Sequence, residues 1–211
     1  CLVETGDEVI VVSPIWPNIF YAQNIVGGRP KFVRLTRAHH GRAWSLDFDE
    51  ITRAIGPRTK AIFVNSPNNP TGWIMSADEQ RRLLDIARKH GVAIISDEVY
   101  GTLVYEGKHA PSFLTIADPD DNLFVVNSFS KAWAMTGWRI GWLTGPKRLA
   151  GPLAQLSMSN NTGAIFSAVI IFAASMPSRS GILMSIITTS GFNSRATFTA
   201  LCPSPTSPTT R

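Results

Sequence analysis

The stretch Asn127-Ser-Phe-Ser-Lys-Ala-Trp-Ala-Met-Thr-Gly-Trp-Arg139 directly follows an apolar run at residues 123–126. This run predicts a short buried strand, because a brief apolar segment beside turn-forming residues is typical of strands packed on both faces. Lys131 would then stand just past the end of that strand, with serine hydroxyls before it and an arginine after it. An amine, hydroxyls and a guanidinium gathered there indicate a site for an anionic ligand.

The sequence around this stretch alternates between short apolar runs and segments with helical signals. Strands are predicted at residues 8–12, 31–35, 60–64, 92–96, 123–126 and 139–143, and helices at residues 18–26, 47–55 and 76–90. Ser76 and Glu79 have the spacing of a capping box at the start of the last helix, and Gly91 is placed to end it. The alternation predicts an α/β fold, a three-layer αβα arrangement with a mostly parallel sheet.

Candidate functional residues follow the predicted strands. Trp16, Asn69, Asp97 and Lys131 each come shortly after a different apolar run. Because parallel strands end at the same edge of a sheet, we expect these side chains to share one crevice. Taken singly, Trp16 fits an ordinary core or surface tryptophan, and Asp97 fits a structural salt bridge. Their combination is what indicates a site.

These residue types together match what pyridoxal 5'-phosphate (PLP) requires of a protein. Its aldehyde needs a lysine, and Lys131 is the only lysine between Lys108 and Lys147. Its pyridine nitrogen acts as an electron sink only while protonated, so a carboxylate such as Asp97 must stand against it. Trp16 can stack on the ring face.

The remaining groups of PLP also find candidates. Asn69 and Tyr100 can donate hydrogen bonds to its phenolic oxygen. Arg139, with the hydroxyls of Ser128 and Ser130, can hold its phosphate. The sequence therefore predicts a PLP site built from several loops.

The motifs that carry these residues resemble those of class I and II aminotransferases, which are fold type I PLP enzymes. The matching pieces are Asn69-Pro-Thr-Gly72, Asp97-Glu-Val-Tyr100, Ser128-Phe-Ser-Lys131 and Gly137-Trp-Arg139-Ile-Gly141, with Pro14-Ile-Trp16 at the position of the family's ring-stacking aromatic. The separations between the motifs also fit. The resemblance covers about residues 1–162 and predicts a PLP-binding large domain that is incomplete at its N-terminus.

The resemblance implies an aminotransferase that moves an amino group between an amino acid and a 2-keto acid. Lys131 would hold PLP and act as general acid and base at the substrate α-carbon. Family members usually share a dimer interface, so a homodimer is expected, with small-molecule substrates as the other partners. Carbon–sulfur lyases share the motifs, so they stay open as an alternative reaction class.

Residues 163–211 do not continue the resemblance. The family's small-domain segment and phosphate-binding helix start would precede residue 1, and the C-terminal arginine that binds the substrate carboxylate has no motif here. This tail lacks acidic residues and ends in Ser/Thr/Pro-rich sequence, which predicts partial disorder. The small domain would be missing or incomplete, and we hypothesise a frameshift or a joined reading frame. A catalytically inactive PLP-binding remnant is therefore a second alternative.

Composition excludes several other classes. The chain is 44% hydrophobic and 17% charged, as globular proteins are, and its net charge of +5 is scattered rather than clustered, so nucleic-acid binding is not predicted. The longest apolar run, residues 164–176, is too short to span a bilayer. No phosphate-cradling glycine motif follows a strand, which disfavours a nucleotide-binding domain.

Cysteine and histidine usage points to a reducing compartment without a metal site. Cys1 and Cys202 stand near opposite ends of the chain, and the adjacent histidines His39 and His40 have no further ligand at suitable spacing. We therefore expect a cytoplasmic protein that binds no metal. The chain begins without a methionine and enters a turn and strand at once, which suggests a piece of a longer protein.

Overall fold

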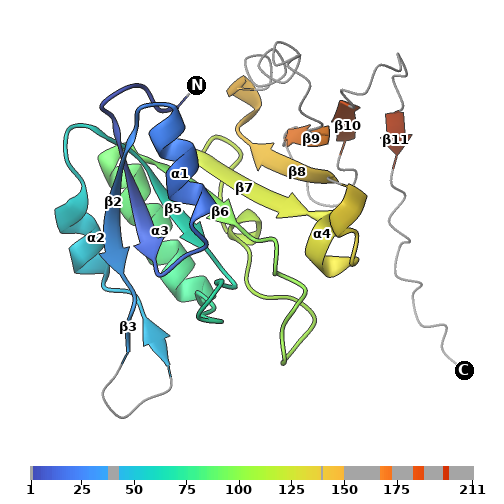
Figure 1. Ribbon diagram of the computed structural model, residues 1–211, viewed down its shortest axis with the longest axis horizontal. Coiled ribbons are helices and arrows are strands. Elements are labelled where there is room, and N and C mark those ends of the chain that lie inside the picture. The colour runs from blue at the N-terminus through green and yellow to red at the C-terminus, as the bar shows by residue number, and fades with distance from the viewer. Residues whose placement is uncertain are drawn as a thin grey trace, which may run out of the picture.

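The computed structural model describes residues 2–37, 43–138 and 140–149, and the backbone of residues 167–172, 183–187 and 197–199. Its strands are β1 (Glu8–Ser13), β2 (Arg29–Arg34), β3 (Thr36–Arg37), β4 (Trp44–Ser45), β5 (Thr59–Asn65), β6 (Ala93–Asp97), β7 (Leu123–Ser128), β8 (Ile140–Gly145), β9 (Ser167–Phe172), β10 (Leu183–Ile187) and β11 (Thr197–Thr199). Its α-helices are α1 (Asn18–Ile25), α2 (Phe48–Ala54), α3 (Ala77–His90) and α4 (Phe129–Ala132), and three short 3-10 helices lie at Phe113–Thr115, Thr136–Trp138 and Lys147–Leu149. Figure 1 shows their arrangement.

One large sheet organises the fold. Its strand order is β11-β10-β9-β8-β7-β6-β5-β1-β2, and β3 and β4 form a separate small hairpin. The strands from β2 through β7 in this order are parallel to one another, whereas β8 runs antiparallel to β7. The predicted mostly parallel sheet is thus confirmed. The sequence did not predict the hairpin or the strands β9, β10 and β11.

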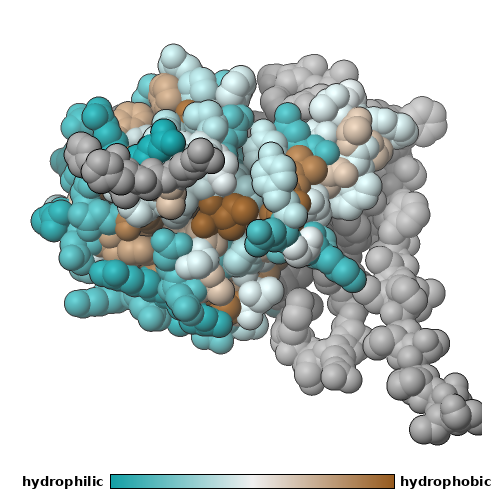
Figure 2. All heavy atoms as spheres, turned by 90° about the horizontal axis from the view of Figure 1, so that it is seen from below, coloured by the Kyte–Doolittle hydropathy of each residue, from teal (hydrophilic) through white to brown (hydrophobic). Residues whose placement is uncertain are grey.

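The register of the sheet aligns the ends of its central strands. Asn65 on β5 pairs with Asp97 on β6, and Asp97 pairs with Val126 on β7. Because these strands are parallel, the loops that follow them leave the same edge of the sheet. Figure 2 looks from below onto the side where β1 and β2 end, and hydrophobic groups reach the surface near its middle.

The two faces of the sheet carry separate apolar clusters, because successive side chains of a strand point to opposite faces. On one face, Ile62 and Ile94 pack with Ile51 of α2 and Leu83 of α3. On the other face, Val11, Phe63 and Phe124 pack with Ile19 of α1 and other partly buried residues. Figure 1 shows α1 in front of the sheet and α3 behind it. The predicted three-layer αβα arrangement is therefore confirmed.

The helix ends follow the predicted signals closely. The Ser76 hydroxyl accepts the N–H of Glu79, while the Glu79 carboxylate accepts the N–H of Ser76, which completes the capping box of α3. Gly91 ends that helix with φ 65°, a left-handed conformation that suits glycine. Asp47 caps α2 by accepting the N–H groups of Asp49 and Glu50, and these bonds hold the pKa of its carboxyl below the usual range.

Within the described part of the chain, no helix is long and apolar enough to cross a membrane. The same residues contain no cluster of histidine, cysteine and acidic side chains that could hold a metal ion. His39 and His40 lie outside the described residues.

Candidate active site

Three predicted site residues from three different loops meet at the carboxyl edge of the sheet. The side-chain amide of Asn69, in the loop after β5, donates a hydrogen bond of 3.4 Å to the hydroxyl of Tyr100, which follows β6. The Nζ atom of Lys131, on α4 after β7, lies 5.8 Å from the centre of the Tyr100 ring. The structure therefore brings Asn69, Tyr100 and Lys131 together, as the parallel strands predicted.

Asp97 ends β6 beside this group and carries a partly buried carboxylate. Burial raises the pKa of its carboxyl, and the hydrogen bond of 3.1 Å from the N–H of Val99 opposes the rise. No cationic side chain forms an ion pair with Asp97 among the described residues. A desolvated carboxylate without a partner is costly, so this position suits a ligand that brings its own positive charge.

The Asn69 loop is tied to β6 by Asn65, the last residue of β5. The side-chain N–H of Asn65 donates to the carbonyl of Asp97 at 3.0 Å, and its side-chain oxygen accepts the backbone N–H of Asn69 at 2.8 Å. The backbone N–H of Ser66 donates to the same Asp97 carbonyl at 3.0 Å. Sequence reasoning did not single out Asn65, although an amide directly after the predicted strand at residues 60–64 is a signal that could have identified it.

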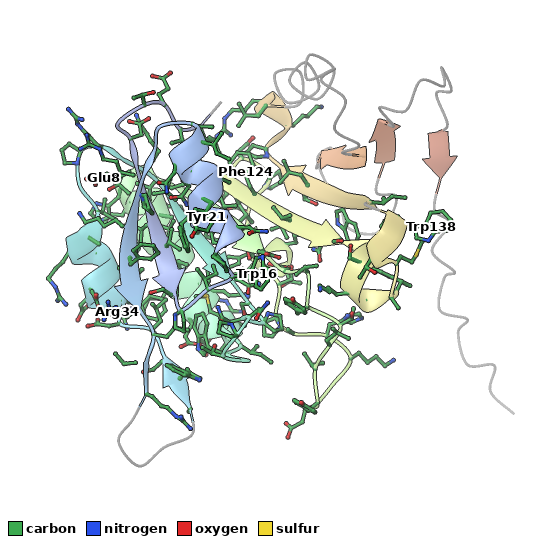
Figure 3. The ribbon with its side chains drawn as sticks, viewed as in Figure 1. Glu8, Trp16, Tyr21, Arg34, Phe124 and Trp138 are labelled. Carbon is green, nitrogen blue, oxygen red and sulfur yellow. The ribbon has the colours of Figure 1, made fainter. Side chains whose placement is uncertain are left out.

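Trp16 lies in the loop after β1, and its side chain is 55% exposed. Figure 3 shows it below α1, on the side where β1 ends. This loop is linked to the loop after β5, because the side-chain N–H of Asn68 donates to the carbonyl of Pro14 at 3.3 Å. An exposed indole at this edge is available to a ligand. Its stacking role stays a prediction.

The serines before Lys131 begin α4. The Ser128 hydroxyl accepts the N–H of Ser130 at 3.0 Å and donates to the carbonyl of Ile140 at 3.3 Å, so it caps the helix and ties it to β8. Ser130 is buried. Gly141 pairs with Ser128 across the two strands, and a Cβ at this glycine would lie 2.7 Å from the carbonyl oxygen of Asn127. The close approach explains why a glycine stands in the motif after Lys131.

Arg139, predicted to hold a phosphate, lies outside the described residues. The phosphate roles of Ser128 and Ser130 likewise stay predictions, since the bonds named above serve the start of α4.

Glu98 is a buried carboxylate that sequence reasoning did not single out. Its Oε1 accepts hydrogen bonds of 3.1 Å from the Ser96 hydroxyl and from the backbone N–H of Phe113. Burial raises the pKa of its carboxyl, against the lowering effect of hydrogen bonds from Ser112, Phe113 and Ser96. Glu98 thereby connects the end of β6 with Phe113, at the far end of the loop that contains Tyr100. No charge pattern in the sequence distinguishes it from a solvent-exposed glutamate.

Comparisons with known proteins identify the family of this chain. The family model of aminotransferase class I and II matches residues 1–189. An aspartate aminotransferase of Geobacillus stearothermophilus is 38% identical over 165 residues, covering 76% of this chain and 41% of the relative. A probable aspartate/prephenate aminotransferase of Thermus aquaticus is 40% identical over 162 residues, covering 76% of this chain and 40% of the relative.

A solved structure shares the fold as well. The crystal structure of an aspartate aminotransferase from Thermotoga maritima is 33% identical, with a TM-score of 0.70 over 75% of this chain and 41% of that one. This chain thus spans about two fifths of the length of the relatives that it matches. The aminotransferases of this family depend on PLP. From the family model, the relatives and the shared fold together, the chain belongs to the class I and II aminotransferase family.

Proposed function

We propose that this chain is the PLP-binding part of an aminotransferase that moves an amino group between an amino acid and a 2-keto acid. The observation that carries the proposal is the meeting of Asn69, Tyr100 and Lys131 beside the partly buried carboxylate of Asp97, which has no cationic partner among the described residues. Amide, phenol, amine and carboxylate are the groups that PLP needs around its ring. Because the chain spans about two fifths of its relatives, the activity of the whole protein is part of the proposal.

Asp97 is the position where the fit to PLP can be judged most directly. A carboxylate that is partly buried and has no cationic partner among the described residues is stabilised by a protonated ring nitrogen placed against it. The same contact would keep that nitrogen protonated. The carboxylate and the cofactor therefore stabilise each other's charged forms.

Lys131 is the residue to which we assign both attachment and proton transfer. Its amine is exposed and stands next to the Tyr100 ring, so a ligand can reach it. Lys131 would hold the aldehyde carbon of PLP covalently until the amine of the substrate takes its place, and the freed Nζ atom would then take the proton from the substrate α-carbon. When bound, PLP supplies the electron sink for the charge left on that carbon.

The other site residues would bind the cofactor and orient it. We assign the phenolic oxygen of PLP to Asn69 and Tyr100, the ring face to Trp16, and the phosphate to Arg139 with Ser128 and Ser130. For Asn69 the described hydrogen bond to Tyr100 supports the assignment, because both groups then face one point. The assignment of Arg139 rests on the sequence motif alone.

Further expectations accompany this proposal. A homodimer follows from the family resemblance, and a cytoplasmic location follows from the two isolated cysteines. The division into a large domain at residues 1–162 and a different tail at residues 163–211 also stays a prediction. Amino acid and keto acid substrates are those of the family.

The proposal is tested by mixing the purified 211-residue chain with PLP and then adding amino acids singly. Aspartate and kynurenine head the series, because relatives are named for them. We expect the visible absorbance of lysine-bound PLP, its loss on addition of a productive amino acid, and its return with a 2-keto acid. Failure to bind PLP would refute the proposal. Binding without any amino-group transfer would instead favour the inactive remnant.

A further inference from the structure

We propose that two buried asparagines, Asn65 and Asn68, are positioning residues that lock the loops after β1, β5 and β6 into the geometry that receives PLP. The inference rests on the function proposed above. It concerns two residues that are not assigned a contact with PLP: Asn65 at the end of β5, and Asn68 in the following loop that also carries Asn69.

Asn65 uses both ends of its side-chain amide to join two loops. It is 3% exposed, and its pairing with Asp97 across β5 and β6 places it between the two strand ends. Its N–H holds the Asp97 carbonyl, while its oxygen holds the backbone N–H of Asn69. One amide therefore fixes the backbone of the residue proposed for the ring nitrogen and of the residue proposed for the phenolic oxygen.

Asn68 connects the loop after β5 to the loop after β1. It is 5% exposed, and its N–H donates to the Pro14 carbonyl, two residues before Trp16. Its side-chain oxygen accepts the backbone N–H of Thr71 at 3.1 Å and the Thr71 hydroxyl at 2.7 Å. The loop of the proposed stacking tryptophan is thus tied to the Asn69 loop.

Both side chains are buried, and the nitrogen and oxygen of each amide are bonded within the protein, which distinguishes positioning from ligand contact. A buried amide that loses its partners leaves unpaired donors and acceptors, which native structures avoid. If either side chain is removed, the loops must become ordered when PLP binds, and that ordering weakens binding. The loss of one or two neutral hydrogen bonds predicts about a tenfold rise in the dissociation constant of PLP.

The test compares Asn65→Ala, Asn65→Asp and Asn68→Ala with wild type in the 211-residue chain. Gln80→Ala is the control for the loss of a buried amide, because Gln80 on α3 is 1% exposed, donates to the Pro111 carbonyl at 3.0 Å and forms no described hydrogen bond to the loops after β1 and β5. Two quantities are measured: amide hydrogen exchange at Asn69 and Thr71 without PLP, and the dissociation constant of PLP from tryptophan fluorescence.

We expect faster exchange at Asn69 in Asn65→Ala and at Thr71 in Asn68→Ala, with PLP binding about tenfold weaker in both. In Asn65→Asp a carboxylate oxygen can still accept the N–H of Asn69, so exchange there stays slower than in Asn65→Ala. The donor to the Asp97 carbonyl is lost and a charge is buried, so PLP binding falls at least as far as in Asn65→Ala. Gln80→Ala should change neither quantity. If Asn65→Ala does not fold, Asn65→Asp and Asn68→Ala carry the test.

Wild-type affinity for PLP in these variants, or an equal loss in Gln80→Ala, overturns the positioning role while leaving the proposed function intact. Unchanged exchange at Asn69 and Thr71 overturns it as well, without any use of PLP. A wild-type chain that does not bind PLP refutes the proposed function itself, and the positioning role with it.

Discussion

Asp97→Asn should weaken cofactor binding without destabilising the PLP-free protein. The wild-type carboxylate is partly buried, burial raises its pKa, and no cation pairs with it among the described residues. An asparagine side chain has nearly the same shape and can still accept the N–H of Val99. The substitution therefore removes the charge while keeping the local hydrogen bond.

The sign of the stability change follows from proton linkage. Because the pKa of Asp97 is higher in the folded state, the folded protein binds this proton more tightly than the unfolded chain does. Its contribution to stability is therefore full at low pH and is lost as the pH rises from the usual aspartate range through the raised folded pKa. Without PLP, Asp97→Asn should match wild type below about pH 4 and equal or exceed it at neutral pH.

The change in cofactor affinity has a larger expected size. A hydrogen bond between charged groups contributes about 1.5–3 kcal/mol, so its loss should weaken PLP binding about 10- to 150-fold. Thermal unfolding of the PLP-free protein across pH and titration with PLP followed by tryptophan fluorescence give the two quantities. Wild-type affinity in Asp97→Asn would refute the assignment of Asp97 to the ring nitrogen. A clear loss of PLP-free stability at neutral pH would refute the account of its burial.

Three further predictions concern neighbouring groups. Glu98→Gln should be more stable than wild type at neutral pH and should lose that advantage as the pH falls toward the usual glutamate range, because burial raises the pKa of Glu98. Chemical denaturation at several pH values measures the difference in the free energy of unfolding. A difference that stays constant with pH would contradict the prediction. Ser76→Ala should lower the free energy of unfolding by about 1 kcal/mol through loss of the α3 capping box, without affecting PLP affinity. A PLP affinity that falls along with stability would contradict the view that this helix end is independent of the PLP site. Tyr100→Phe removes the partner of the Asn69 amide and a donor to the phenolic oxygen of PLP. The visible absorbance of bound PLP should therefore titrate at a higher pH than in wild type. An unshifted titration would refute the assignment of Tyr100 to the phenolic oxygen.

Apart from the β3–β4 hairpin, the order of strands and α-helices through β7 could be predicted from the sequence, because local signals decide it. Apolar runs marked the buried strands, and the Ser76–Glu79 spacing and Gly91 marked the ends of α3, where the structure has them. The strand β9 was missed because the apolar run at residues 164–176 was considered only as a membrane span. The strands β10 and β11 were missed because serine or threonine interrupts their short apolar pattern. The antiparallel direction of β8 also has no local signal, because the side-chain alternation of a strand is the same in both directions.

The candidate site was predictable where residue chemistry alone is distinctive. Lys131, Asp97, Asn69 and Tyr100 followed predicted strands, and the structure places them at one edge. Asn65 and Glu98 were not singled out, because their importance comes from burial and from partners distant in sequence. A single sequence shows neither quantity. A polar residue directly after a buried strand is the only local hint.

The most direct test of the central claim is to locate the lysine that binds PLP. The protein is incubated with PLP, reduced with borohydride to fix the attached cofactor, digested and analysed by peptide mass spectrometry. We predict one modified peptide, carrying the phosphopyridoxyl group on Lys131, and its absence in Lys131→Ala. The other lysines, Lys31, Lys60, Lys89, Lys108 and Lys147, serve as internal controls. Modification spread over these lysines, or none at Lys131, would contradict the account.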